Sequence, residues 1–476
     1  MYLCVIFKNR FYYTIMFYTL AINWSGAGVQ VAQLILALSI LVLLHEFGHY
    51  ITARWFGCRV EKFYLFFDPW FSLFKKKVGD TEYGVGWLPL GGYVKISGMI
   101  DESMDKEQMK QPAKSYEFRS KPAWQRLIIM LAGIIMNVLV AFIIYAMILF
   151  VWGEQKTPMS SIRDGVAVTD SLMSDIGLRS GDKILAVNGE PVVYFEDLAA
   201  KILIGSETID VERDGKKMTV NVPVNLIGKL VESRRKKAYM FTERVPSYVG
   251  EYDKKFKMDT LGGFKAGLRK MDLVTAIDAT PVRFFDEMSA VVNSKKNQQV
   301  QLSVVRNGQP LTLTAKVDAD GKLGIPRLTD EEYEALGAYK IEKREYGFLA
   351  AFPAGVNKSI EKLKAYIDQF ALILNPKTEA YKGVGGFKAM GSVFPTYWSW
   401  EAFWNITAFL SIVLAFMNLL PIPALDGGHV MFTLYEMISG RKPNEKFLEY
   451  AQMVGMILLL GLMLYANGND WFGWGR

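Results

Sequence analysis

The chain has 476 residues, of which 51% are hydrophobic and 22% charged; this composition excludes a disordered protein, and the length allows two to four domains. The net charge of +7 is compatible with nucleic-acid binding, but the basic residues cluster beside apolar segments. We therefore interpret them as signals of membrane topology and expect no nucleic-acid partner. Cys4 and Cys58 lie far apart and indicate neither a disulfide framework nor a CxxC site.

Residues 1–28 form an N-terminal extension to which we assign no function. The stretch is apolar, and Lys8 and Arg10 resemble the start of a signal peptide, yet no small-residue cleavage site precedes the next apolar run. Met16 is an alternative start.

Four later segments are apolar over the roughly 20 residues that a helix needs to cross a bilayer. They are residues 29–56, 124–152, 401–425 and 447–468. The loop 57–123 and the short loop "SGRKPNEK" are rich in Lys and Arg, which predicts that both face the cytoplasm. The expected fold class is a polytopic α-helical membrane protein with four core transmembrane helices, two in 29–152 and two in 401–476.

The first span ends in "LLHEFGHYIT", where two histidines and a glutamate interrupt an apolar run. His45 and His49 are four residues apart and share one face of a helix, from which two imidazoles can hold one Zn²⁺ ion. Glu46 is placed to act as general base on a water at the metal. Charged side chains at the centre of a membrane helix cost about 2.5–3.5 kcal/mol each, so this cluster needs a metal or polar partners.

Residues 82–98, "EYGVGWLPLGGYVKISG", alternate in polarity and contain paired glycines. This pattern predicts a β-hairpin in the loop after the first span. A plain cytoplasmic β-ribbon and a membrane-associated hairpin are both open at this point.

The region 153–350 contains two copies of one pattern. "GLRSGDKILAVNGEPVVYFEDL" at 177–198 aligns with "GLRKMDLVTAIDATPVRFFDEM" at 267–288, and "VERDGKKMTVNV" is echoed by "VVRNGQPLTLTA". Each copy predicts short strands, a helix and a hairpin with an Asp-Gly or Asn-Gly turn. The copies, 153–240 and a degenerate 241–330, resemble circularly permuted bacterial PDZ domains, which bind peptides at a sheet edge. Modules that act only as spacers or steric plugs are the alternative.

Residues 331–400 are expected to form an amphipathic and linker region. In 352–374 apolar residues recur at helical spacing, among them Phe352, Ile360 and Ile367, with lysines mostly off that stripe. The pattern predicts a helix on the outer membrane surface, and a helix facing the protein core is the alternative.

The third span supplies a candidate for the third metal ligand that a catalytic zinc site requires. Asp426 lies in "NLLPIPALDGGHV", directly after Pro421 and Pro423, which break the helix. Broken helix at membrane depth is tolerated only where protein or a polar cavity satisfies the freed backbone groups. We therefore predict Asp426 as the third ligand, with His429 as the alternative.

The two motifs, in this order, resemble the site-2 protease family of intramembrane zinc metalloproteases. The resemblance rests on His45, Glu46 and His49 in HExxH and on Asn418, Pro421, Pro423, Asp426 and Gly427 in NxxPxPxxDG. The tandem PDZ-like insert is similar to that of the regulator-of-sigma-E branch. "LAGIIMN" resembles a further family motif, AGPxxN, but has Ile134 in place of proline; Asn137 is expected to make a helix–helix hydrogen bond.

The resemblance implies the cofactor, the site residues and the location. Zn²⁺ would be held by His45, His49 and Asp426, with Glu46 as the catalytic base. The membrane-associated hairpin, through Gly84 and Gly86, and the broken helix, through Asn418, Pro421 and Pro423, would bind the substrate as an extended strand. The protein would lie in the bacterial inner membrane, with PDZ domains outside and the active site toward the cytoplasm.

The function implied is an intramembrane zinc metalloendopeptidase that cuts single-span membrane proteins, either an anti-sigma factor or leftover signal peptides. Its partners would be these substrates, peptides at the PDZ domains and membrane lipid. The alternative is an inactive membrane-anchored PDZ scaffold with a structural metal.

The charge bias predicts the orientation of the chain, which cysteine labelling measures. In a chain without Cys4 and Cys58, cysteines placed near residues 76 and 442 should react with an impermeant reagent only from the cytoplasmic side. Cysteines near residues 215 and 308 should react from outside. The reverse pattern would overturn the orientation.

Overall fold

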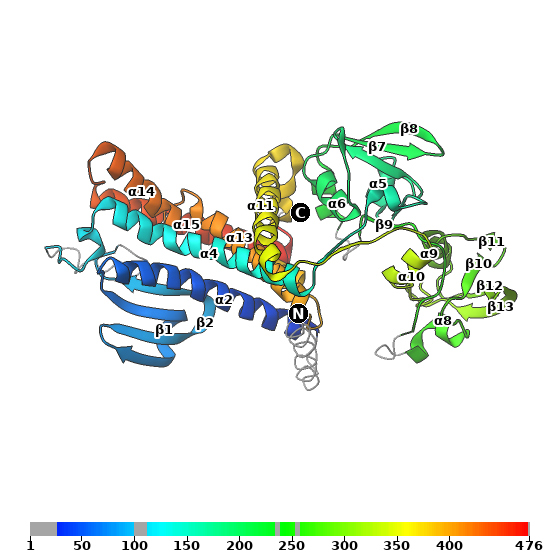
Figure 1. Cartoon of the computed structure of the whole chain (residues 1–476), viewed down its shortest axis with the longest axis horizontal. Helices are drawn as coiled ribbons and strands as arrows, with labels where there is room; N and C mark the ends of the chain where they lie inside the picture. The colour runs from blue at the N-terminus through cyan, green and yellow to red at the C-terminus, as the bar shows by residue number, and fades with distance from the viewer. Residues whose placement is uncertain (1–25, 100–111, 234–238, 253–257, 475–476) are drawn as a thin grey trace. The chain divides into compact units, whose positions relative to one another are not determined.

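The computed structural model describes residues 26–99, 112–233, 239–252 and 258–474, without the side chains of Leu90, Asp259 and Glu445. Nearly all of the predicted N-terminal extension, residues 1–28, lies outside the described residues. The chain divides into two units, each with its own packing (Figure 1). Unit 1 takes in the chain up to 153 together with 345–370 and 384–476, and unit 2 takes in 154–344 and 371–383.

Unit 1 contains the long helices and one β-sheet. Its elements in chain order are α2 (Gly26–Trp55), β1 (Val60–Val78), β2 (Thr81–Ile96), η1 (Phe118–Ser120), α4 (Ala123–Val151), α11 (Phe348–Leu374, whose last turn falls in unit 2), α12 (Phe387–Val393), α13 (Trp400–Leu419), α14 (Asp426–Ser439) and α15 (Glu445–Phe472).

Helices α2, α4, α13 and α15 are each long and apolar enough to cross a membrane, as the sequence predicts. Helix α4 packs against both α2 and α13 around a shared cluster that includes Leu41, Ala141 and Ile412. The third span ends at Leu419 rather than at the predicted 425. Leu420 is extended, and Pro421 and Pro423 follow, so a new helix, α14, begins only at Asp426.

The predicted hairpin has a different form from the one expected. Residues 81–96 are one bent strand, β2, and the tight turn at Gly79 and Asp80 joins it to β1. Residues 62–65 of β1 pair with 82–85 on one side and with 92–95 on the other. The bent strands β1 and β2 lie beside α2 (Figure 1), where the Tyr50 and Tyr83 hydroxyls are 2.6 Å apart.

Helix α11 packs through only part of its predicted apolar stripe, since Leu363 lies against the cluster around Leu41 and the Phe370 ring is 5.3 Å from that of Phe416. Phe352, Ile360 and Ile367 are exposed, whereas Ala351, Gly355 and Ser359 are buried. A Cβ on Gly355 would lie 2.5 Å from the backbone nitrogen of Ala146 on α4. Small side chains therefore let α11 and α4 approach closely at this point.

Unit 2 contains short strands and helices. Its elements are β3 (Glu154–Lys156), η2 (Met159–Ser161), β4 (Val166–Val168), α5 (Ser171–Asp175), β5 (Lys183–Val187), β6 (Glu190–Pro191), α6 (Phe195–Leu203), β7 (Thr208–Arg213), β8 (Lys216–Asn221), α7 (Leu226–Glu232), β9 (Phe241–Glu243), η3 (Met258–Thr260), α8 (Gly262–Lys265), β10 (Leu273–Ile277), β11 (Thr280–Pro281), α9 (Phe285–Ser294), β12 (Gln299–Arg306), β13 (Gln309–Lys316), α10 (Asp330–Ala335), β14 (Glu342–Arg344), η4 (Pro376–Thr378) and η5 (Ala380–Gly383).

The repeat in the sequence corresponds to two modules with one topology. The first module has the sheet order β6-β5-β7-β8 and the second β11-β10-β12-β13. Each has a register shift at the same place, after Ile184 and after Val274. Both hairpins turn at the predicted Asp-Gly and Asn-Gly pairs, where Asp214 and Asn307 have positive φ.

A buried carboxylate clamp is also duplicated. Asp182 and Asp272 are each about 1% exposed. Arg213 donates to both carboxylate oxygens of Asp182 at 2.7 Å and to the Gly177 carbonyl. Arg306 likewise donates to both oxygens of Asp272, at 2.7 and 2.8 Å, and to the Gly267 carbonyl. Bidentate pairing of this kind satisfies a buried charge and fixes the loop before each central strand.

The chain returns to the first module after completing the second. Leu328, Tyr333 and Tyr339 belong to the hydrophobic core of the first module. Strand β14 then pairs with β3, from Glu342 with Lys156 to Arg344 with Glu154. Residues 328–344 therefore pack with the first module, although the sequence places 331–344 in the linker region.

Candidate metal centre and its cavity

The two histidines of HExxH lie on one face of α2. One helical turn separates them, and their Nε2 atoms are 3.3 Å apart. The side chains of His45 and His49 are 12% and 8% exposed. Regular helix over Gly26–Trp55 is therefore enough to bring both imidazoles to one point.

Asp426 reaches the same point from the start of α14. Its Oδ2 lies 3.1 Å from His45 Nε2 and 3.3 Å from His49 Nε2. The turn before it is tight: Ala424 has φ of 80°, a left-handed conformation that a non-glycine residue adopts only when its surroundings impose it. A Cβ on Gly427 would lie 2.2 Å from the Leu420 carbonyl oxygen, so only glycine fits there.

The donor set fits a zinc ion. Tetrahedral bonds of about 2.0–2.1 Å put ligand atoms about 3.3 Å apart, which matches the 3.1–3.3 Å separations between the three side-chain atoms. Asp426 Oδ2 is buried and, although it is within ion-pair distance of both rings, it accepts no hydrogen bond with acceptable geometry. A buried carboxylate oxygen without a donor, facing two imidazole nitrogens, is suited to a cation.

Groups on α4 orient the two rings. His49 Nδ1 lies 2.8 Å from the Ile129 carbonyl oxygen, which accepts the Nδ1 proton and leaves Nε2 free for a metal. His45 Nδ1 lies 3.2 Å from the side-chain amide of Asn137. With Nε2 of His45 on a metal, Nδ1 carries the proton, and Asn137 then presents its amide oxygen. Ser411 on α13 donates to the backbone oxygen of Asn137, so three helices meet there.

Two glycines make room for this arrangement. A Cβ on Gly133 would lie 2.3 Å from His49 Nε2, and one on Gly48 would lie 2.5 Å from the Ala132 carbonyl oxygen. Helices α2 and α4 therefore approach closely where the imidazoles lie. Sequence reasoning missed both glycines; their signal was a glycine inside each of two helical, apolar segments.

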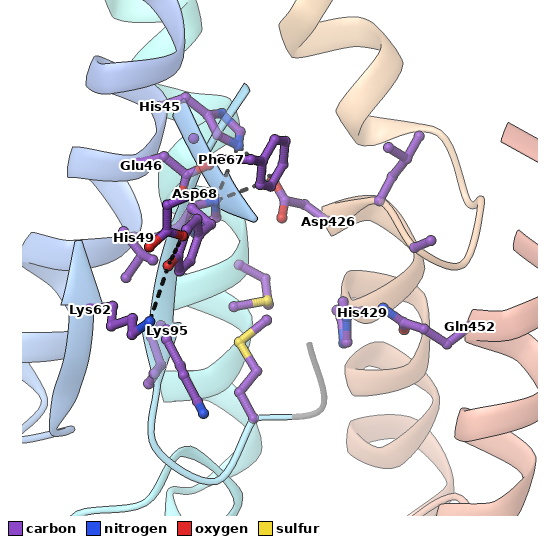
Figure 2. A pocket seen from close by; sticks show the side chains of 18 of the residues that line it. His45, Glu46, His49, Lys62, Phe67, Asp68, Lys95, Asp426, His429 and Gln452 are labelled. Atoms are coloured by element: carbon purple, nitrogen blue, oxygen red, sulfur yellow. Dashed lines mark hydrogen bonds and ion pairs between the residues drawn. The ribbon is translucent and has the colours of Figure 1, made fainter. Parts of the chain in front are cut away.

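A cavity of about 710 Å³ surrounds the three ligand atoms. Its lining residues come from α2, the β1–β2 hairpin and Met99 after it, α4, α14 with the turn before it, and α15, and ten of them are labelled in Figure 2. Glu46 lies on the α2 wall, where the Val94 backbone N–H donates to its carboxylate and Gly92 passes close by. The cavity thus combines a metal-ligand set, a carboxylate beside it and space for a ligand.

The hairpin wall of the cavity carries a small polar network. Tyr93 donates to Asp68 Oδ1 at 2.9 Å, and Lys62 Nζ lies 3.5 Å from the Tyr93 hydroxyl. Burial raises the pKa of the Tyr93 hydroxyl, and the hydrogen bond to Asp68 adds to this effect. Tyr93 therefore remains a neutral donor. Sequence reasoning did not single out these three residues.

The remaining predicted site residues lie away from the cavity lining. Asn418 is half-buried in the last turn of α13, and Pro421 and Pro423 shape the turn before Asp426. Gly84 lies under the Tyr64 ring and Gly86 under the Phe67 carbonyl, so both permit close packing within the hairpin. Their predicted contact with substrate stays a prediction. His429 lines the cavity but is not part of the group of three ligand atoms within the described residues.

A family model, peptidase family M50, matches residues 33–462 of the chain. The chain belongs to this family. A Neisseria meningitidis relative named as a zinc metalloprotease is 27% identical over 460 residues, covering 92% of this chain and 97% of the relative. The regulator of sigma-E protease RseP of Escherichia coli is 26% identical over 461 residues, covering 93% and 98%. A Rickettsia conorii relative, also named as a zinc metalloprotease, is 28% identical over 451 residues, covering 93% and 98%.

The recognition made from the two motifs is confirmed, because M50 is the site-2 protease family. This M50 protein is a zinc metalloprotease. The predicted cofactor, zinc, is supported by the named relatives and by a group of side chains that can hold a metal.

Metal analysis tests the ligand set. The purified protein should hold about one zinc per chain, and His45→Ala, His49→Ala or Asp426→Ala should abolish stoichiometric binding. Asn137→Ala should weaken zinc binding by about 10- to 100-fold, since it orients His45. His429→Ala is the matched control. Full zinc in Asp426→Ala with loss in His429→Ala would show that the third ligand is His429.

Proposed function

We propose that this M50 metalloprotease is an intramembrane endopeptidase that cuts single-span membrane proteins within or near their transmembrane segment. The observation that carries the proposal is the position of the metal-ligand cluster. His45, His49 and Asp426 converge beside Glu46 in a cavity lined by three helices of membrane-crossing length, α2, α4 and α15, by α14 and by the β1–β2 hairpin. A water-dependent reaction at such a place has membrane-embedded peptide as its natural substrate.

The roles of the residues follow from their chemistry. His45, His49 and Asp426 hold zinc, which when bound polarises the scissile carbonyl and lowers the pKa of a coordinated water. Glu46 accepts a proton from the attacking water and passes it to the leaving amine. The Val94 N–H holds the Glu46 carboxylate in place.

The substrate must be unwound before it is cut, because a helical peptide keeps its carbonyls in internal hydrogen bonds. We assign the binding of the extended substrate to the hairpin with Gly84 and Gly86 and to the broken helix with Asn418, Pro421 and Pro423. Strand β2 supports this assignment, since its residues 92–96 pass along the cavity beside Glu46.

The two modules of unit 2 act, in this proposal, as PDZ domains outside the membrane that exclude substrates with a bulky folded ectodomain. Their shared topology and duplicated clamp support two peptide-binding domains of one type. The protein lies in the bacterial inner membrane, with the loop 57–123 in the cytoplasm. Two relatives are named for the regulation of sigma-E, which favours an anti-sigma factor as substrate; clearance of signal peptides is a second candidate.

An inactive scaffold with a structural metal is the alternative. A structural zinc site has four protein ligands and no open position. Three ligand atoms facing a cavity, with a carboxylate next to them, favour a catalytic site instead.

The proposed activity is tested by removing the base alone. Glu46→Gln keeps the size and hydrogen-bonding capacity of the side chain but not its basicity, so zinc content should remain and proteolysis should fall by at least 100-fold. Comparison of membrane proteomes with intact and Glu46→Gln enzyme should show single-span proteins accumulating. Unchanged cleavage with unchanged zinc would rule out Glu46 as the base.

The proposed exclusion of bulky ectodomains by the two modules is tested by deleting both modules, with the ends of the deletion chosen from their packing. Since residues 328–341 complete the core of the first module, the deletion should run from 157 to 341 and leave the β3–β14 pair joined by a short glycine-rich turn. Cleavage of a substrate with an intact ectodomain should rise, and that of a trimmed one should change less. If the deleted form keeps zinc and discriminates as before, the modules are not the filter.

A further inference from the structure

One polar side chain of the cavity has no role in the chemistry described so far. Gln452 lies on α15, a span with few buried residues, yet it is only 5% exposed itself. It lines the cavity that holds the metal-ligand cluster. No hydrogen bond joins its amide to any other side chain or backbone group that the structure describes.

The position of Gln452 is set by a close helix contact. A Cβ on Gly455, one turn further along α15, would lie 1.7 Å from the Pro423 carbonyl oxygen, so glycine is required there. This contact brings α15 against the turn that precedes Asp426. Gln452 then reaches the cavity from the side opposite His45 and Glu46, next to His429 of α14 (Figure 2).

An unpaired amide at this depth points to a ligand. The Gln452 amide is not among the fully buried polar atoms without a partner in the described residues, so it faces the open space of the cavity. A polar group in a membrane helix that faces such a space is a candidate for function. On the hairpin wall of the cavity the polar residues have partners: Tyr93 donates to Asp68, and Lys62 Nζ lies 3.5 Å from the Tyr93 hydroxyl. Gln452 is the side chain left with both a donor and an acceptor to offer.

An extended peptide has the complementary need. Each residue of an unwound strand presents one N–H and one C=O, and neither finds water in a membrane-embedded site. A glutamine amide can accept from the N–H and donate to the C=O of a peptide unit, which a hydroxyl or a charged group does less well.

We propose that Gln452 is a substrate-binding residue whose side-chain amide hydrogen-bonds a peptide unit of the unwound substrate next to the scissile bond. In this arrangement Gln452 contacts the extended substrate from the α15 side of the cavity, and β2 lies on the opposite side of the substrate. This inference rests on the proposed intramembrane proteolysis and extends it to a residue outside both motifs.

The test uses full-length protein and a synthetic single-span peptide in detergent micelles. Gln452→Met keeps the length of the side chain and removes only the amide, and Met453→Ala, on the exposed neighbour, is the matched control. In the Glu46→Gln background, Gln452→Met should weaken peptide binding by about tenfold, as for one or two neutral hydrogen bonds. Met453→Ala should bind as the parent does. Zinc content and thermal stability should be the same in all forms.

A backbone change in the peptide identifies the bond. Replacing single amides near the scissile bond by esters should weaken binding to the Gln452 form at one position and have no further effect on Gln452→Met. With active enzyme, Gln452→Met should raise KM more than it lowers kcat. Equal peptide binding by the parent protein and by Gln452→Met would overturn this inference and leave the proposed function standing. Absence of both binding and cleavage in the parent enzyme, for any single-span peptide, would overturn the proposed function and the inference with it.

Discussion

The burial of two imidazoles and a carboxylate among apolar helices is the constraint on which the rest of unit 1 depends. Such groups are tolerated at membrane depth only when other polar groups or a cation satisfy them. Three groups pair with the ring nitrogens of His45 and His49: the Ile129 carbonyl and the Asn137 amide on the α4 side, and the Asp426 carboxylate on the cavity side. A metal ion fits this set, because it can use all three converging atoms at once.

The same constraint accounts for the glycines and prolines around the site. Gly48 and Gly133 let α2 and α4 approach until the rings of α2 reach polar groups on α4. Pro421 and Pro423 end α13, and Gly427 lets α14 restart immediately, so that Asp426 is carried on the first turn of a helix. The positive end of the α14 dipole there favours a carboxylate. The glycines and prolines around the site thus set the positions of its polar side chains.

Unit 2 is organised by a different device, repeated twice. In each module a buried aspartate accepts a bidentate arginine from the neighbouring strand, and the same arginine ties the loop through a carbonyl. The second copy keeps this clamp although Met271 replaces the glycine at position 181 of the first and adopts a positive φ. The second module thus keeps the Asp272–Arg306 clamp although its backbone is strained at Met271. This indicates that the clamp is the interaction that stabilises the loop in each module.

The sequence by itself determined that there are four apolar spans, the family, the two-copy insert with its hairpin turns, and the pairing of His45 with His49 on one helix face, because these depend on local spacing. That Asp426 meets the two imidazoles depends on how α14 packs against α2, and its role as the third ligand stays a prediction. Residues four apart share a helix face whatever the fold, and prolines break a helix wherever they occur. The packing faces were not determined in this way. The buried face of α11 follows from small residues that meet α4, and the path of residues 81–96 follows from pairing with a distant strand. Gln452 became visible only in the tertiary structure, because a glutamine in an apolar helix has no meaning until its neighbours and the cavity beside it are known.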